Sequence, residues 1–266
     1  MAIVSRKSGN LLYLIDDAIP VPHAFTTRLG GVSEGTLSTL NLGVNRGDDP
    51  DAVLENYRRL TSLFGITTEE LVLSRQVHGD VVRVVTEADR QGDLFRSTES
   101  EADGLVTGAK NLPLIVFTAD CIPILLWDEK TGAVGAVHAG WRSTVLDIAG
   151  RAVDQLVSAL GAAPQTIRAA IGPGIGLCCF ETDPEVPEAL TACLGDEAAN
   201  CIRDAAPGKC MVDLKEANRL LLLRRGLLPE RISVAEHCTM CMPQLFWSNR
   251  IHGTGRGSQA ALILSK

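Results

Sequence analysis

The chain has 266 residues, 45% of them hydrophobic and 21% charged, and its formal net charge is −7. This length fits one large domain or two small ones with a sizeable apolar core. The acidic balance and the lack of a basic run argue against binding to duplex DNA or an anionic membrane, because those surfaces need clustered lysine and arginine.

Three helices are predicted where apolar residues recur at helical spacing. The first begins at Pro50 after the capping residue Asp49, and the last has the start of a capping box at Asp213. Glycine ends each of them, as is common after helices. The middle segment is read as one unbroken helix. The three segments are residues 48–65, 143–161 and 212–226.

Short apolar or β-branched runs bounded by turn residues predict the strands. They lie at residues 11–15, 23–27, 71–75, 81–85, 113–118, 122–127, 133–138, 167–171, 231–236 and 259–264. Many of these strands follow one another directly, so sheets with helices packed outside are favoured over a regular alternation. No linker divides the chain, and residues 1–266 are expected to form a single domain. Within it, we expect a surface loop at 92–104 and an irregular insertion at 182–210.

The N-terminal segment MAIVSRKSGNLLYLIDDAIP lacks the apolar core of a signal peptide. The longest apolar runs, LPLIVF and IPILLW, are far shorter than the roughly 20 residues that span a bilayer. We therefore expect a soluble, cytoplasmic protein. In that compartment, cysteines are expected as free thiols or metal ligands rather than disulfides. The chain has eight: Cys121, Cys178, Cys179, Cys193, Cys201, Cys210, Cys238 and Cys241.

Three segments carry a metal-binding side chain near the end of a predicted strand. SRQVHGD, TADC and HAGWRST contribute His78, Cys121 and His138. Two imidazoles and one thiolate suit Zn²⁺ or copper, and three protein ligands leave a fourth position open, as in catalytic zinc sites. However, the spacing matches no local zinc motif. The residues alone therefore leave both a metal site and an ordinary hydrogen-bonding role open.

Two charged residues accompany these segments. Asp120 interrupts an apolar run, and burying a carboxylate is costly unless it is paired, so we expect a cation, a hydrogen-bond donor or a metal-bound group beside it. The alternative is a capping role in a turn. HAGWRST follows a strand and opens a helix, so free N–H groups together with Arg142 can bind an anion there. A purely structural turn is the equal alternative.

Two further segments contain cysteine pairs. HCTMC, at 237–241, includes a C-x-x-C. A loop with inert cysteines is favoured there, because the chain has no second C-x-x-C to close a structural zinc site. IGPGIGLCCFE, at 171–181, is rich in glycine but lacks the order of a dinucleotide-binding motif after a strand. It is expected to form a tight loop near a pocket.

Taken together, these motifs resemble the bacterial laccase-domain proteins, also called polyphenol oxidase family proteins or bacterial purine nucleoside phosphorylases. The resemblance rests on TTRLGGVSEGTLSTLNLG, SRQVHG, ADGLVT, TADC, VHAGWR, IGPGIGLCCFE and the C-terminal TGR, in that order. It implies an α/β domain of mixed sheets sandwiched between outer helices, similar to cysteine-histidine deamidase toxins. It also implies that His78, Cys121 and His138 form one metal site holding Zn²⁺, or alternatively copper.

The resemblance further implies phosphorolysis of adenosine, inosine or methylthioadenosine, together with adenosine deamination. The partners are then a nucleoside and phosphate, and a monomer is expected. Cys121 and Asp120 are the catalytic candidates, with Asp120 as the acid/base nearest in sequence. The chain has only five histidines and no H-x-H pair, which argues against a true multicopper laccase. The substrate-binding candidates are Arg28, Asn41, Gln76 and Arg142.

Three alternatives remain. In a metal-free cysteine hydrolase, Cys121 would be the nucleophile and His138 its base, and such chemistry could edit cell-wall precursors. A single copper ion in the triad could instead support weak polyphenol oxidation. A module that binds a nucleotide or metal without turnover is a third reading.

Overall fold

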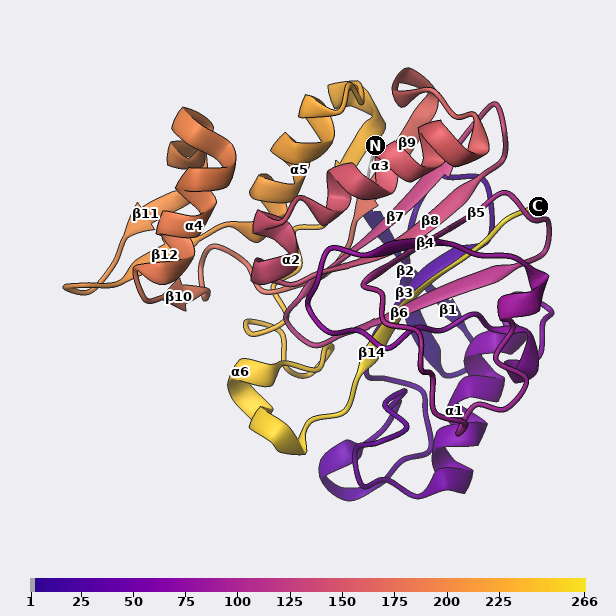
Figure 1. Cartoon of the computed structure of the whole chain (residues 1–266). Coiled ribbons are helices and arrows are strands. Elements are labelled where there is room, and N and C mark those ends of the chain that lie inside the picture. The colour runs from indigo at the N-terminus through magenta and orange to yellow at the C-terminus, as the bar shows by residue number, and fades with distance from the viewer. Residues whose placement is uncertain (1–2) are drawn as a thin grey trace.

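Two β-sheets lie face to face at the centre of the computed structural model, which describes residues 3–266 (Figure 1). Residues 1 and 2 of the predicted domain lie outside the described residues. One sheet contains, in order, β1 (Ile3–Ser8), β2 (Leu11–Asp16), β3 (His23–Thr26), β14 (Gln259–Leu264) and β6 (Pro113–Thr118). The other contains, in order, β13 (Ile232–Val234), β9 (Ile167–Ile171), β7 (Ile122–Asp128), β8 (Val134–Ala139), β5 (Gly104–Thr107) and β4 (Val82–Val84).

Alternation of side chains along the strands builds three apolar layers. Leu114 and Val116 of β6 pack in the core between the sheets, while Ile115 joins the cluster under helix α1 (Pro50–Ser62). On the outer face of the larger sheet, β7 residues such as Ile124 pack with helices α3 (Ile148–Leu160) and α5 (Leu214–Arg224). Both sheets are thus enclosed by helices, and the larger one pairs strands in both directions. The predicted α/β class with mixed sheets between outer helices is confirmed.

Two predicted elements are wrong in detail. The helix expected across 143–161 is divided into α2 (Trp141–Val145) and α3, because Asp147 adopts a left-handed conformation with φ 60°. Its carboxylate accepts a hydrogen bond from the amide of Gly150 at 3.1 Å and so starts a new helix. The strand expected at 71–75 makes only isolated bridges, at Val72 and Arg75.

The stretch 182–210 is not irregular, contrary to the prediction. It contains helix α4 (Glu185–Leu194), which packs Val186, Leu190 and Leu194 into the outer core. Beside it, a small sheet extends from one side of the molecule (Figure 1). Its strands, in order, are β10 (Glu181–Thr182), β12 (Cys210–Val212) and β11 (Ile202–Asp204). A last short helix is α6 (Asn249–His252).

The eight cysteines are all free thiols, as expected. Within residues 3–266, none of the helices has the length and apolar character needed to cross a bilayer.

Candidate metal centre and substrate pocket

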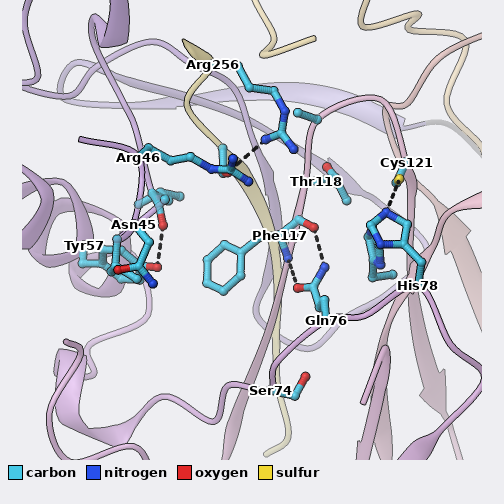
Figure 2. A pocket seen from close by; sticks show the side chains of 16 residues that line it. Asn45, Arg46, Tyr57, Ser74, Gln76, His78, Phe117, Thr118, Cys121 and Arg256 are labelled. Carbon is cyan, nitrogen blue, oxygen red and sulfur yellow. Dashed lines mark hydrogen bonds between the residues drawn. The ribbon is translucent and has the colours of Figure 1, made fainter. Parts of the chain in front are cut away.

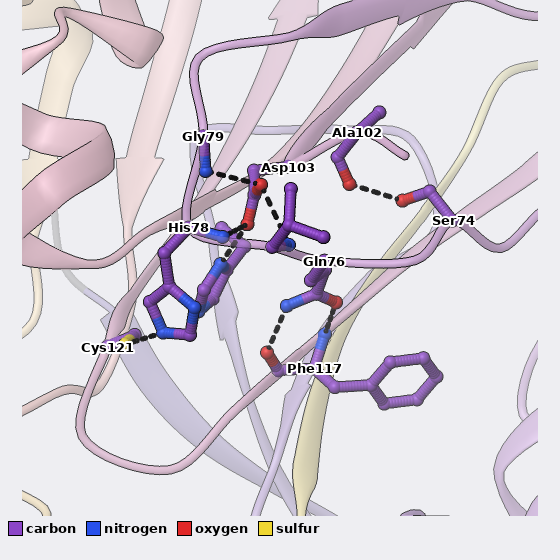
Figure 3. Close-up of polar contacts among 10 residues, drawn as sticks. Ser74, Gln76, His78, Gly79, Ala102, Asp103, Phe117 and Cys121 are labelled. Carbon is purple, nitrogen blue, oxygen red and sulfur yellow. Dashed lines mark hydrogen bonds and ion pairs between the residues drawn. The ribbon is translucent and has the colours of Figure 1, made fainter. Parts of the chain in front are cut away.

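The three predicted metal ligands converge at one edge of the larger sheet. Antiparallel pairing of β7 with β8 sets Pro123 opposite His138, which brings Cys121, just before β7, close to that histidine. His78 arrives from a separate loop in a left-handed conformation, with φ 61°. Its Nε2 lies 3.7 Å from the sulfur of Cys121 (Figure 3). The ligand atoms of the three residues all lie within 4.8 Å of one another, so one ion can contact all of them.

Gly140 makes this convergence sterically feasible. A Cβ atom at that position would lie 2.7 Å from Cδ2 of His78 and 3.2 Å from the sulfur of Cys121. Since real Cβ atoms essentially never approach another heavy atom within 3.0 Å, a side chain here would push the His78 ring away. The glycine of the H-A-G-W segment is therefore required by its close packing against the side chains of His78 and Cys121.

Asp103 holds both histidines in place. It lies in the segment predicted as a surface loop, yet it is fully buried. Its carboxylate accepts hydrogen bonds from Nδ1 of His138 at 2.7 Å and from the amides of His78 and Gly79 at 3.0 and 2.8 Å (Figure 3). A histidine that donates Nδ1–H to a carboxylate leaves Nε2 free to bind a metal.

The charges of the site favour a thiolate at Cys121. Burial opposes ionisation, but the positive charge of His138 and hydrogen bonds from both histidines lower the pKa of Cys121 to about 6. Conversely, burial disfavours the His138 cation, but the Cys121 charge and the Asp103 hydrogen bond raise its pKa to about 9. For Asp103, burial also opposes ionisation, while hydrogen bonds from His138 and from backbone amides hold its pKa below the usual range. A thiolate with a carboxylate-oriented imidazole is a donor set that fits Zn²⁺ or copper.

This thiolate gives a pH prediction for the metal-free protein. Because the pKa of Cys121 is lowered, its alkylation by iodoacetamide should rise through about pH 6 and level off below pH 8. Buried Cys201, whose pKa is raised to about 12, is the internal control and should stay unmodified. Peptide mass spectrometry at a series of pH values measures both sites. Cys121 alkylation that keeps climbing above pH 8 would contradict the ion pair.

Asp120 is engaged elsewhere. Its carboxylate accepts hydrogen bonds from the hydroxyls of Thr239 and Ser248, at 2.6 and 3.1 Å, and from the amide of Arg250, at 2.8 Å. The expectation that hydrogen-bond donors meet this buried carboxylate agrees with the structure. These three hydrogen bonds link the C-terminal segment to the turn that carries Cys121. Because both carboxylate oxygens of Asp120 already accept hydrogen bonds, Asp120 is poorly placed to exchange a proton with a substrate.

A cavity of about 470 Å³ adjoins the three ligands, with His78, Cys121 and His138 in its wall (Figure 2). Phe117 also lines it, and its ring meets Tyr57 edge to face at 6.3 Å between centroids. Gln76 fixes Phe117, since its amide group donates to the Phe117 carbonyl at 2.7 Å and accepts from the Phe117 amide at 2.8 Å. The predicted residue Gln76 thus lies in the cavity wall, where it positions an aromatic ring.

The other three predicted substrate residues do not line this cavity. Arg28 donates to the carbonyls of Ser38 and Pro243 and stacks over Trp247 at 3.8 Å. Asn41 is fully buried and accepts from the amides of two loops through one side-chain oxygen. Arg142 is exposed and lies over its neighbour, the Trp141 ring, at 4.3 Å.

Two arginines that the sequence analysis did not select line the cavity instead. Arg46 and Arg256 lie side by side (Figure 2), and Arg46 makes no ion pair within the described residues. Burial lowers the pKa of Arg256, and the nearby Arg46 charge adds to this effect. Two neighbouring guanidinium groups that make no ion pair among the described residues can bind an anion. The T-G-R motif was the available signal for Arg256, but nothing in the sequence joins it to Arg46.

The chain is similar in sequence to proteins of one known family. Residues 22–266 match the family described as multi-copper polyphenol oxidoreductase laccase. The chain belongs to this family. Its relatives include the purine nucleoside phosphorylase YlmD of Geobacillus stearothermophilus, 39% identical over 90% of this chain and 88% of that protein. The adenosine deaminase RL5, from an unknown prokaryotic organism, is 37% identical over 88% of this chain and 90% of that protein.

A solved structure of the family has the same fold. The Bacillus licheniformis hypothetical protein YfiH superposes with a TM-score of 0.93, at 33% identity, covering 98% of this chain and 99% of that one. The family description refers to several coppers. Among residues 3–266, however, side chains that could hold a metal gather in only two groups, and only one of these contains histidine. A multicopper centre needs many more imidazoles than this.

Proposed function

We propose that this chain is a Zn²⁺-dependent purine nucleoside phosphorylase that acts on adenosine, inosine and methylthioadenosine, with adenosine deaminase activity. One observation carries the proposal: a three-ligand site and an arginine pair share the wall of one cavity. The names of the relatives support the same activities. Zn²⁺ held by His78, Cys121 and His138 would supply a Lewis acid that polarises a reacting oxygen.

The other residues bind and orient the two substrates. Arg46 and Arg256 would hold phosphate through charge-assisted hydrogen bonds, and the Phe117 ring would stack against the purine. In phosphorolysis, an oxygen of phosphate forms a bond to C1′ of the ribose while the bond from C1′ to the base breaks. The base leaves with that electron pair and takes up a proton. Holding both reactants in one cavity lowers the entropic part of the barrier.

The arginine pair separates the two activities. Deamination uses water instead of phosphate, so Arg46→Ala and Arg256→Ala should impair phosphorolysis selectively. A lost charge-assisted contact of about 1.5–3 kcal/mol corresponds to roughly a 10–100-fold rise in the KM for phosphate. Adenine, hypoxanthine and inosine are measured by chromatography after incubation of adenosine or inosine with and without phosphate.

Wild type should release free base only when phosphate is present. It should form inosine from adenosine even when phosphate is absent. Arg6→Ala is the matched control, since Arg6 lies on the surface in an ion pair with Asp17. An equal loss of both activities in the two cavity variants would assign these arginines to folding rather than to phosphate binding. Free base formed at the same rate without phosphate would exclude phosphorolysis.

A cysteine hydrolase is the second candidate, because Cys121, His138 and Asp103 form a chain of nucleophile, base and orienting carboxylate. Such an enzyme would keep its activity in the presence of a chelator and lose it on alkylation of Cys121. A copper oxidase would instead require copper in the same triad.

The eight free thiols also favour a reducing compartment, which supports our proposal of a cytoplasmic location.

A further inference from the structure

A second group of thiols lies outside the substrate cavity. The sulfurs of Cys178, Cys179, Cys238 and Cys241 all lie within 4.8 Å of one another. Cys241 is 3.5 Å from Cys178 and 3.3 Å from Cys179. Inert cysteines were expected at 237–241 because C-T-M-C has no partner motif in the sequence. The structure supplies the missing partners as an adjacent pair, which no C-x-x-C pattern would detect.

Strand pairing brings the two pairs together. β9 and β13 are parallel neighbours, with Ile171 opposite Val234, so the segments that follow them leave the same edge of the sheet. Beyond that edge, Gly174 and Cys238 form an isolated bridge, and the Thr239 amide donates to the Gly174 carbonyl at 3.1 Å. The approach of the four sulfurs is therefore fixed by backbone contacts.

The spacing of the sulfurs fits one tetrahedral ion. With zinc–sulfur bonds of about 2.3 Å, the edges of a tetrahedron of sulfurs are about 3.8 Å long. Two of the sulfur pairs, at 3.3 and 3.5 Å, lie near that length, and the largest separation is 4.8 Å or less. An iron–sulfur cluster distributes its thiolates over several irons and needs them further apart.

The surroundings also suit a negatively charged centre. The amide of Gly176 donates to the sulfur of Cys238 at 3.2 Å. Lys215 is buried nearby and donates to the carbonyls of Ala235 and His237, both at 2.7 Å. Neither carbonyl carries a charge that would neutralise the ammonium group, and a buried charge is costly unless charges nearby compensate it. Burial lowers the pKa of Lys215, and the charges of Cys238, Asp213 and Cys178 oppose that shift.

We propose that Cys178, Cys179, Cys238 and Cys241 bind one structural Zn²⁺ ion, separate from the His78–Cys121–His138 site. On binding, each thiol releases its proton, so four thiolates and one Zn²⁺ make a centre of charge −2 that Lys215 and the backbone amides stabilise. Four protein ligands leave no open position for a substrate, which distinguishes this site from the triad.

The proposed ion also stabilises the turn that carries Cys121 in the substrate site. It joins the two loops that hold the turn around Asp120, because Ile175 donates its amide to the Asp120 carbonyl at 2.8 Å and Thr239 donates its hydroxyl to the Asp120 carboxylate. Asp120 directly precedes Cys121. The second metal thereby keeps the ligand Cys121 at its place in the cavity wall.

The test is to count zinc per chain in the intact protein, purified with added zinc, by elemental analysis and native mass spectrometry. We expect about two ions in wild type, about one in Cys178→Ser, Cys241→Ser and Cys121→Ala, and none in the double variant Cys121→Ala/Cys241→Ser. Cys193→Ser and Cys210→Ser are matched controls, being half-buried free cysteines outside both groups, and should keep two.

Wild type alone gives a second readout that does not depend on the folding of any variant. X-ray absorption at the zinc edge should show about 2.5 sulfur neighbours per zinc for one triad ion and one tetrathiolate ion, against about one for the triad alone. A single zinc with one sulfur neighbour would overturn the proposal. A disulfide from Cys241 to Cys178 or Cys179 in the zinc-loaded protein, or iron with acid-labile sulfide, would do the same.

Discussion

Cys121→Ala is expected to remove zinc from the triad and to abolish both phosphorolysis and deamination. The variant loses the only thiolate among the three ligands, leaving two imidazoles. A metal that stabilises charge in the transition state contributes several kcal/mol, so kcat/KM should fall about a thousandfold or more. Steady-state kinetics with adenosine, with and without phosphate, measures the loss.

The fold should survive this change. Cys121 is only half-buried, and its neighbour Asp120 keeps its contacts with Thr239 and Ser248. With zinc removed from both proteins, the Tm of Cys121→Ala should therefore stay close to that of wild type. Cys193→Ser should leave both activities unchanged. Full activity in a Cys121→Ala protein that binds no zinc at the triad would refute the metal-dependent mechanism.

Asp103→Asn is the second change with a large expected effect. The carboxylate is fully buried and accepts hydrogen bonds from His138 and from three successive amides, those of Val77, His78 and Gly79. An amide nitrogen in place of one oxygen would face donors instead of accepting from them. We expect zinc affinity to fall about 10–100-fold, and the free energy of unfolding to fall by about 3 kcal/mol.

The pH dependence of stability tests the same carboxylate. The pKa of Asp103 is lower in the folded protein, so its contribution is present above the unfolded pKa of about 3.9 and is lost as pH falls through the folded value. Asp103→Asn should lack this part of the acid transition. Asp17→Asn, which affects an exposed ion pair with Arg6, should change the unfolding free energy by about 1 kcal/mol or less. Equal effects of the two variants, measured by urea unfolding, would contradict the role given to Asp103.

Buried strands are the part of this fold that sequence reasoning predicts well. β6, β9 and β14 have the predicted bounds of 113–118, 167–171 and 259–264, because strands buried on both faces are continuous apolar runs that end at turn residues. The break before α3 was missed, since apolar spacing continues across Asp147 and only its backbone conformation divides the helix. The 71–75 segment has the composition of a strand but makes only isolated bridges.

For the candidate site, the sequence predicts some of the residues but not how they come together. Residue chemistry and family resemblance were enough to select His78, Cys121 and His138. Their approach depends on the register of β7 against β8, which composition does not determine. Arg46 and Arg256 come from distant parts of the chain, and no local pattern links them. Likewise, the link between Cys178 and Cys241 required knowledge that β9 and β13 are neighbours.

The position of β14 has a consequence for synthesis on the ribosome. This strand lies between β3 and β6 in the five-stranded sheet, with Ala261 paired to Phe25 on one side and to Val116 on the other. Until β14 has left the exit tunnel, β3 and β6 both present unpaired edges. The five-stranded sheet can therefore form completely only after Leu264 has left the tunnel, and until then the unpaired edges of β3 and β6 expose the nascent chain to aggregation.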